Sequence, residues 1–355
     1  MATWRRLLAV FLLLAVALLG DALASGSALA QQEGNVPGAP LGNQSDAEFW
    51  RALRQGDPGT VSAPNPAGGV LIQSEGDNWR AVRNGPLSTY GVWGLIGIVA
   101  LLALFFLIRG RIRIEHGRSG AYVTRFNALD RFTHWLTAFC FVILALTGLN
   151  MLYGRYVLRP VIGADAFALL TLAGKYAHDY LAFGFMLGLV LMFVLWIVHN
   201  FPNRYDFVWL AKGGGLFMRG VHPPAKKFNA GQKIIFWLVI LGGISVSLSG
   251  IMLLFPFRLE MFGETFAWVN RLFGTEYPTA LTPLQEMQLA QLWHAMMGLF
   301  LTILIIAHIY IGTIGMEGAF DAMGSGKVDR NWAREHHNLW VEDLEKRGRL
   351  ASGDD

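Results

Sequence analysis

The stretch MQLAQLWHAMMGLFLTILIIAHIYIGTIG, residues 287–315, decides the fold of this chain. It is long enough to cross a bilayer, contains no Asp, Glu, Lys or Arg, and carries two histidines, His294 and His308. The two histidines are fourteen residues apart, just under four helical turns, so both imidazoles lie on one helical face. They are separated by about 21 Å along the axis, within a membrane core about 30 Å thick. The stretch therefore predicts a transmembrane helix that offers nitrogen ligands at two depths.

The composition predicts an integral membrane protein. Of the 355 residues, 54% are hydrophobic and only 15% are charged, which lies outside the range of ordinary soluble domains. Several runs of eighteen or more residues contain no Asp, Glu, Lys or Arg. The net charge of +4 does not indicate nucleic acid, because the basic residues lie in loops beside the apolar runs. Membrane lipid is the expected surrounding.

The chain has one cysteine, Cys140, inside an apolar run. One cysteine excludes an intrachain disulfide, covalent haem attachment through CxxCH and an iron–sulfur cluster held by this chain alone. Any redox centre in this chain therefore needs histidine or another non-thiolate ligand.

The first thirty residues resemble a secretory signal peptide. Arg5 and Arg6 precede an apolar core, and the small residues at 28–30 form a cleavage site before Gln31. An uncleaved anchor helix is the alternative. Residues 31–90 are rich in Gly, Pro, Asn, Gln and Ser, and predict an exported, polar and largely irregular segment.

Five membrane spans follow, and the basic residues between them orient the chain. The spans are expected at 91–108, 132–153, 176–199, 234–257 and 287–315. The segments 109–131, 199–233 and 316–355 each contain six Lys and Arg residues. The segments 154–174 and 256–286 each contain two. The positive-inside rule places the richer segments in the cytoplasm. The sequence thus predicts an all-α, multi-pass protein of a bacterial inner membrane, with a periplasmic N-terminal segment and a cytoplasmic C-terminus.

The domain organisation follows from these spans. The span at 91–108 is an extra N-terminal helix, residues 109–315 form a four-helix domain, and residues 316–355 form a cytoplasmic tail.

Four histidines within the four-helix domain pair by depth. His134 and His308 lie towards the cytoplasmic side, and His178 and His294 lie towards the outer side. Imidazole is a suitable axial ligand for haem iron, and each electron-transfer haem takes two axial ligands. The pairs therefore predict two bis-histidine b haems, one near each leaflet. A proton relay or simple packing is the alternative.

The other five histidines have less specific surroundings. His116, His222, His336 and His337 lie in basic aqueous segments, where we expect them to be solvated. His199 begins an inner loop, where interface packing or contact with a haem propionate are the two interpretations.

The residues 228–233, FNAGQK, lie where the fourth span meets the cytoplasm, level with the inner histidine pair. The side-chain amides of Asn229 and Gln232 could hydrogen-bond the carbonyls of a quinone at this position. Helix capping by Asn229 is the alternative.

These motifs together resemble a known family. From Arg125 to about Arg349 the chain is similar to the gamma subunit of membrane-bound formate dehydrogenase, a di-haem cytochrome b. The motifs that carry the resemblance are FNALDRFTHW, LTGLNMLYG, KYAHDYLAFG, VHNFPNRYD, KKFNAGQK, QLWHAMMG, IAHIYIGTIG and GKVDRNWAREHHNLW. The signal peptide, the polar segment and the extra span depart from the compact four-helix form of that family.

The resemblance implies a function for the chain. It implies that His134, His178, His294 and His308 are the haem ligands, and that quinone is reduced near Asn229, Gly231, Gln232 and His308. It also implies two exported partners, an iron–sulfur subunit and a molybdenum or tungsten catalytic subunit. Formate oxidation would take place in the catalytic partner, and this chain would pass the electrons through both haems to quinone.

Two other classes of function are compatible with the same residues. The catalytic partner could be a nickel–iron hydrogenase or a thiosulfate or polysulfide reductase, whose cytochrome b subunits share the four-helix plan. The histidines could also line a transporter, although the spans contain a single carboxylate, Asp179, and the chain lacks internal repeats.

Overall fold

The computed structural model describes residues 76–350. The predicted signal peptide and most of the predicted irregular segment, up to residue 75, lie outside the described residues.

Within residues 76–350, five helices are long and apolar enough to cross a membrane, which confirms the predicted multi-pass helical fold. The spans run over Asn78–Arg109, Ala128–Val157, Ala164–His199, Ala230–Leu254 and Pro283–Gly315. The first span comprises α3 (Gly76–Val82), a π-helical turn (Arg83–Leu87) and α4 (Ser88–Arg109). The other helices are α5 (Ala128–Val157), α7 (Ala164–Trp196), α9 (Ala230–Leu254) and α11 (Pro283–Tyr310), which ends in a π-helical turn (Ile311–Gly315).

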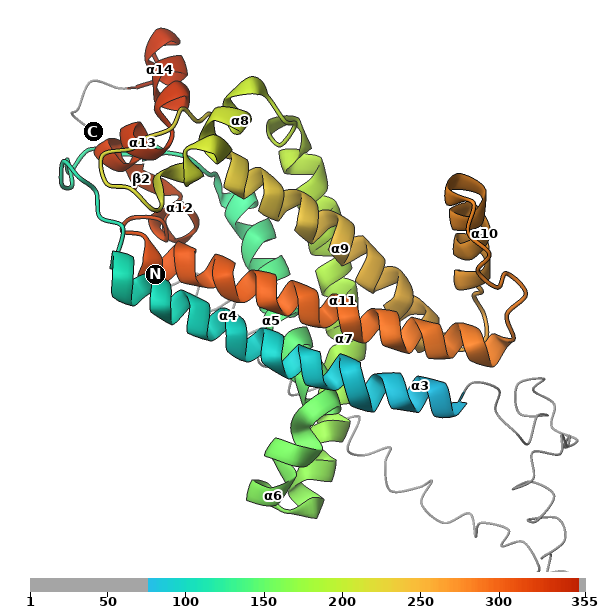
Figure 1. Cartoon of the computed structure of the whole chain (residues 1–355). Coiled ribbons are helices and arrows are strands. Elements are labelled where there is room, and N and C mark those ends of the chain that lie inside the picture. Colours follow the sequence, from blue (N-terminus) through green and yellow to red (C-terminus); the bar gives the residue numbers. More distant parts are fainter. Residues whose placement is uncertain (1–75, 351–355) are drawn as a thin grey trace, which may run out of the picture.

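The first span begins earlier than its composition predicts. Residues 76–90 were expected to be irregular, but the helix starts at Gly76 and continues into α4. The chain passes Pro86 because Gly85 leaves helical geometry, with φ −95° and ψ −106°. The Ser88 hydroxyl bridges this break by donating to the Arg83 carbonyl at 2.6 Å. Contact between α3 and α11 further supports helix formation in this polar sequence (Figure 1).

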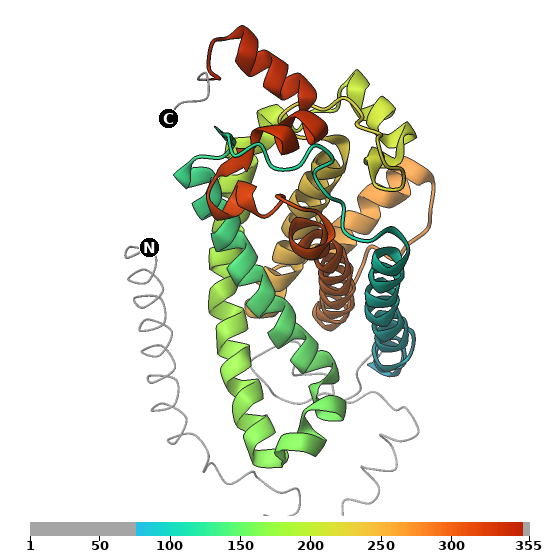
Figure 2. The same cartoon turned by 90° about the vertical axis from the view of Figure 1, so that its left-hand side faces the viewer.

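The helices pack in two antiparallel pairs, α5 with α7 and α9 with α11, and α4 covers α11 (Figures 1 and 2). Small residues permit these close approaches. A β-carbon added at Gly184 would lie 2.9 Å from the Cys140 sulfur, and one added at Gly188 would collide with Thr137. On α4, a β-carbon at Gly91 would lie 2.7 Å from a Leu299 methyl group.

The two pairs are joined differently at the end opposite the basic loops. A short helix, α6 (Arg159–Ile162), connects α5 to α7, whereas α10 (Phe262–Phe273) lies in the connection from α9 to α11. Figure 1 shows α6 and α10 far apart, because the two pairs diverge towards this end.

A buried carboxylate fixes the start of α10. Glu286, in the first turn of α11, is only 2% exposed. Its carboxylate accepts hydrogen bonds from the backbone N–H groups of Met261, Phe262 and Gly263 at 3.1, 2.8 and 2.7 Å. These groups would otherwise be unpaired at a helix N-terminus, so Glu286 ties α10 to α11.

The other end, which we call the basic end, is built from the segments 110–127, 197–229 and 316–350. It holds β1 (Tyr122–Thr124), α8 (Arg204–Ala211), α12 (Asp321–Gly324), β2 (Lys327–Asp329), α13 (Arg330–His336) and α14 (Asn338–Lys346), with 3-10 turns at Ile197–His199 and Gly213–Gly215. β1 and β2 pair antiparallel, with Val123 opposite Val328. The three segments richest in Lys and Arg thus lie together, as the predicted orientation requires.

Candidate functional site

The four membrane histidines form two facing pairs between helices. The ring centroids of His134 on α5 and His308 on α11 are 6.1 Å apart, with an interplanar angle of 53°. The centroids of His178 on α7 and His294 on α11 are also 6.1 Å apart, at 62°. Each histidine pair therefore contains one ring from α11 and one ring from either α5 or α7.

The separation of the rings matches two imidazoles on opposite sides of one metal ion. A metal–imidazole bond is about 2 Å long and the nitrogen lies roughly 1.1 Å from the ring centre, so two such rings are about 6 Å apart. Among residues 76–350, no group of three or more His, Cys, Asp or Glu side chains is arranged to hold a bare metal ion. Two nitrogens at each position instead fit haem, whose macrocycle supplies the other four ligands.

The hydrogen bond of His178 fixes its tautomer. Its Nδ1 lies 2.8 Å from the Thr147 hydroxyl oxygen, and that hydroxyl donates its own hydrogen to the Ile143 carbonyl at 2.7 Å. With its one hydrogen directed to a backbone carbonyl, of Ile143 or Leu144, the hydroxyl oxygen accepts from Nδ1–H, which leaves the lone pair of His178 on Nε2. This is the arrangement found in metal-binding histidines, whose second nitrogen donates to a neighbouring oxygen.

His294 is held in the same tautomer by α9. Its Nδ1 lies 3.0 Å from the Val246 carbonyl, which can only accept, and 3.1 Å from the Ser249 hydroxyl. A β-carbon at Gly250 would lie 3.1 Å from the Cε1 atom of His294, so glycine allows the ring to lie directly against α9. The lone pair of His294 is consequently on Nε2 as well.

The inner pair presents an unsatisfied nitrogen. The Nδ1 atom of His134 is buried and has no hydrogen-bond partner among the described residues. No hydrogen bond within the described residues therefore fixes the tautomer of this ring, and the fit of the inner pair to haem rests on the separation of its two rings.

The amides at the start of α9 are used in a helix cap. The Asn229 side chain accepts from the Gln232 N–H at 2.9 Å, and the Gln232 side chain accepts from the Asn229 N–H at 3.1 Å. Both side-chain oxygens therefore cap the helix, which is the alternative that the sequence analysis gives for Asn229. Gly231 lies against Trp209, since a β-carbon there would be 2.9 Å from the indole.

His337 is buried and His336 is half-buried, so the prediction that these two histidines of the tail are solvated is wrong. His337 has no exposed surface, and its Nδ1 lies 2.7 Å from the Lys226 carbonyl. Burial lowers the pKa of His336 to about 4 and that of His337 well below its usual value. The sequence signal that was missed is the four-residue spacing of Trp332 and His336, which places both on one face of α13.

The remaining histidines lie nearer the surface. His116 pairs with Glu335 at 2.9 Å and His222 pairs with Glu115 at 3.0 Å. The ring of His199 stacks on Phe228, with centroids 6.2 Å apart, so packing accounts for its position in the described residues.

Two pairs of imidazoles inside a bundle of membrane-spanning helices are the arrangement expected of a membrane cytochrome. Residues 125–326 match the family described as prokaryotic cytochrome b561. The chain belongs to this family, whose members are helical membrane proteins that bind haem b.

Relatives with assigned names agree with the resemblance seen in the motifs. The chain is 26% identical, over 63% of its length and 92% of the relative, to the cytochrome b556(Fdn) subunit of the nitrate-inducible formate dehydrogenase of Escherichia coli strain K12. It is 25% identical, over 63% and 94%, to the cytochrome b556(fdo) subunit of formate dehydrogenase of the same strain. It is 23% identical, over 62% and 83%, to the formate dehydrogenase cytochrome b556 subunit of Haemophilus influenzae. The resemblance to formate dehydrogenase gamma subunits is thereby confirmed.

Proposed function

We propose that this chain is the cytochrome b membrane subunit of a formate dehydrogenase, and that it carries electrons across the membrane through two b haems to a quinone. His178 and His294 would hold the outer haem, and His134 and His308 the inner haem. The observation that carries this proposal is the equal separation of the two ring pairs, 6.1 Å each, on one shared helix. When bound, haem supplies a one-electron carrier at each depth.

The protein's own residues prepare the outer pair for this role. Thr147 and the Val246 carbonyl each accept from an Nδ1–H group, so both Nε2 lone pairs are available in a fixed ring orientation. All four residues are half-buried between membrane-spanning helices, where a low-dielectric surrounding would influence the reduction potential.

The orientation and the partners follow from the same proposal. The basic end would face the cytoplasm of a bacterial cell, and α6 and α10 would face the periplasm, where an iron–sulfur subunit and a molybdenum or tungsten subunit would deliver electrons. The names of the relatives support a formate dehydrogenase over a nickel–iron hydrogenase or a thiosulfate or polysulfide reductase. The family match gives no support to a transporter.

Quinone would bind at the basic end near Asn229, Gly231, Gln232 and His308. Because the cap uses the side-chain oxygens of Asn229 and Gln232, their amide nitrogens are the groups suited to donate to a quinone carbonyl.

Formate-driven reduction of the haems tests the function. In membranes that contain the whole complex, formate is expected to produce the reduced b-type alpha and Soret bands, and quinone is expected to remove them. Hydrogen, thiosulfate and polysulfide serve as comparison substrates. Reduction by one of these and not by formate would contradict the assignment of the catalytic partner, and a colourless pure subunit would contradict the cytochrome itself.

Thr147→Val is expected to raise the reduction potential of one haem without displacing it. Valine keeps the shape but removes the acceptor for His178 Nδ1–H, so the imidazole donates less electron density and the oxidised iron is less stable. A redox titration followed at the alpha band measures the change. Thr302→Val, which removes a hydroxyl that donates to the Gly298 carbonyl, is the matched control. Equal shifts in both variants would disprove the role of Thr147.

A further inference from the structure

The basic end contains a series of histidines and carboxylates that the haem sites do not use. Its outer part lies in an open cleft of about 470 Å³, lined by His116, His222, Asn331, Arg334 and Glu335. Within it, the His116 ring contacts the Glu335 carboxylate at 2.9 Å, and the His222 Nε2 contacts the Glu115 carboxylate at 3.0 Å. Groups that exchange protons with solvent therefore begin the series.

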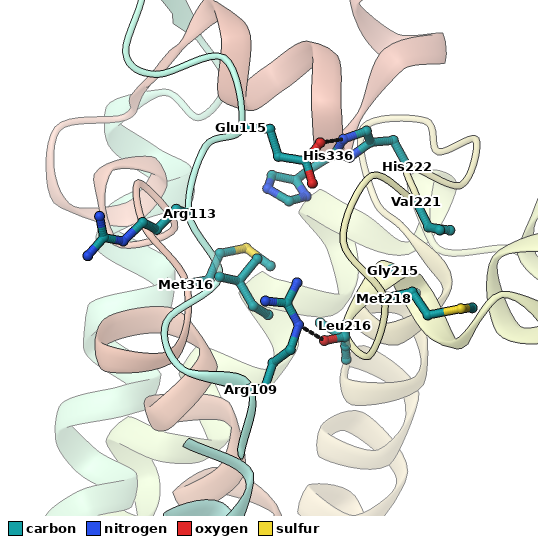
Figure 3. Close-up of a pocket in the computed structure, with 12 residues that line it drawn as sticks. Arg109, Arg113, Glu115, Gly215, Leu216, Met218, Val221, His222, Met316 and His336 are labelled. Carbon is teal, nitrogen blue, oxygen red and sulfur yellow. Dashed lines mark hydrogen bonds and ion pairs between the residues drawn. The ribbon is translucent and has the colours of Figure 1, made fainter. Parts of the chain in front are cut away.

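A small internal pocket continues the series inward. Its volume is about 20 Å³, and Glu115, His222 and His336 lie in its wall together with Arg109 at the end of α4 (Figure 3). A polar space of this size holds about one water molecule. His222 lines both the cleft and the pocket, and its ring centroid is 6.3 Å from that of His336. The Nε2 atom of His336 is buried without a hydrogen-bond partner among the described residues.

From His336 the series reaches the start of α9. The rings of His336 and His337 both pack on Trp332, with centroids 5.2 and 5.3 Å away. The Nε2 atom of His337 is buried and likewise unpaired in the described part of the chain. Arg125 lies 5.3 Å from the centre of the Trp332 ring and donates to the Gln232 side chain at 3.1 Å. Arg125 thus connects the Trp332 ring, on which both imidazoles pack, to the residue assigned above to quinone binding.

We propose that the series Glu115, His222, His336 and His337 conducts protons from the solvent at the basic end towards a quinone bound beside Gln232, and that the protonated guanidinium of Arg125 holds Gln232 in position. The proposal rests on the proposed function, because it needs a quinone at that place. Reduction of one quinone to quinol takes two electrons, which the haems of this chain would deliver one at a time, and two protons. The electrons arrive through the membrane, so the protons must enter from the aqueous phase at the basic end.

The chemistry of the buried pair supports conduction over packing. A neutral imidazole carries a donor on one nitrogen and an acceptor on the other, so it can accept a proton and pass another on. The depressed pKa values of His336 and His337 keep both rings in this neutral form at pH 7. If the two rings served only for packing, apolar side chains at these positions would make the fold more stable, because each unpaired buried nitrogen costs about 1–3 kcal/mol.

Single-turnover oxidation of the haems tests the proposal. The intact complex is first reduced with formate, then mixed with decylubiquinone, while haem oxidation is followed at the alpha band and proton uptake with a pH-indicating dye. The variants are His336→Gln and His222→Gln, and Asn331→Ala is the matched control because it alters the same cleft without removing a titratable group.

In His336→Gln we expect formate to reduce the haems as in wild type, while haem oxidation and proton uptake slow together by at least about tenfold. Millimolar imidazole should restore both rates, since a diffusible base replaces the missing carrier. Rates within twofold of wild type in both His336→Gln and His222→Gln would overturn the relay. His222 is partly exposed, so its variant decides the matter if His336→Gln does not assemble. A wild-type complex whose haems quinone does not oxidise would instead overturn the proposed function.

Discussion

His294→Ala is expected to lower the haem content of the purified protein to about half, with complete loss of the outer haem. Alanine removes one of only two protein ligands, and the remaining His178 cannot hold a six-coordinate iron alone. His178→Ala should give the same result, whereas His134→Ala or His308→Ala should remove the inner haem. The pyridine haemochrome assay measures the content, and redox titration identifies which haem is lost.

His199→Ala is the matched control for the four ligand variants. His199 belongs to the same membrane-spanning stretch as His178, but its ring stacks on Phe228 and faces no second imidazole in the described residues. We expect its variant to retain both haems. Full haem occupancy in His294→Ala and His178→Ala would refute the assignment of the ligands.

Glu286→Ala is expected to release the start of α10 and to destabilise the connection between α9 and α11 by about 3 kcal/mol or more. The substitution leaves three backbone N–H groups without their acceptor at a site that is closed to water. Amide hydrogen exchange measured by mass spectrometry should show faster exchange over residues 261–273.

Glu264→Ala separates this effect from a general loss of negative charge. Glu264 lies in the first turn of α10 and is exposed, so its removal should change exchange little. If Glu286→Ala and Glu264→Ala exchanged at the same rate over residues 261–273, the buried carboxylate would have no anchoring role.

The membrane part of this fold was largely predictable. A bilayer core of fixed thickness demands long apolar runs, and all five expected spans occur within the described residues. The fixed rise per helical residue then places each histidine at a depth, and the two depth-matched pairs do face each other. Several helices extend a few residues beyond the expected spans, because polar residues such as those of α3 can continue a helix past the apolar core.

The basic end was not predictable, because its structure depends on contacts between distant segments. Val123 meets Val328 across two three-residue strands, and His337 meets the Lys226 carbonyl. None of these segments has an apolar period long enough to indicate burial by itself. The amides of Asn229 and Gln232 show the same limit, since their types suit both a helix cap and a quinone contact, and only coordinates reveal the cap.

The divergence of the two helix pairs has a consequence for assembly. Each imidazole couple joins α11 to a helix of the other pair, so iron coordination would act as a cross-link between two hairpins that splay apart towards α6 and α10. The free energy of haem binding would then contribute directly to the free energy of folding. Newly inserted chains would remain only loosely closed until haem is delivered, which makes haem supply the step that commits the subunit to its mature shape.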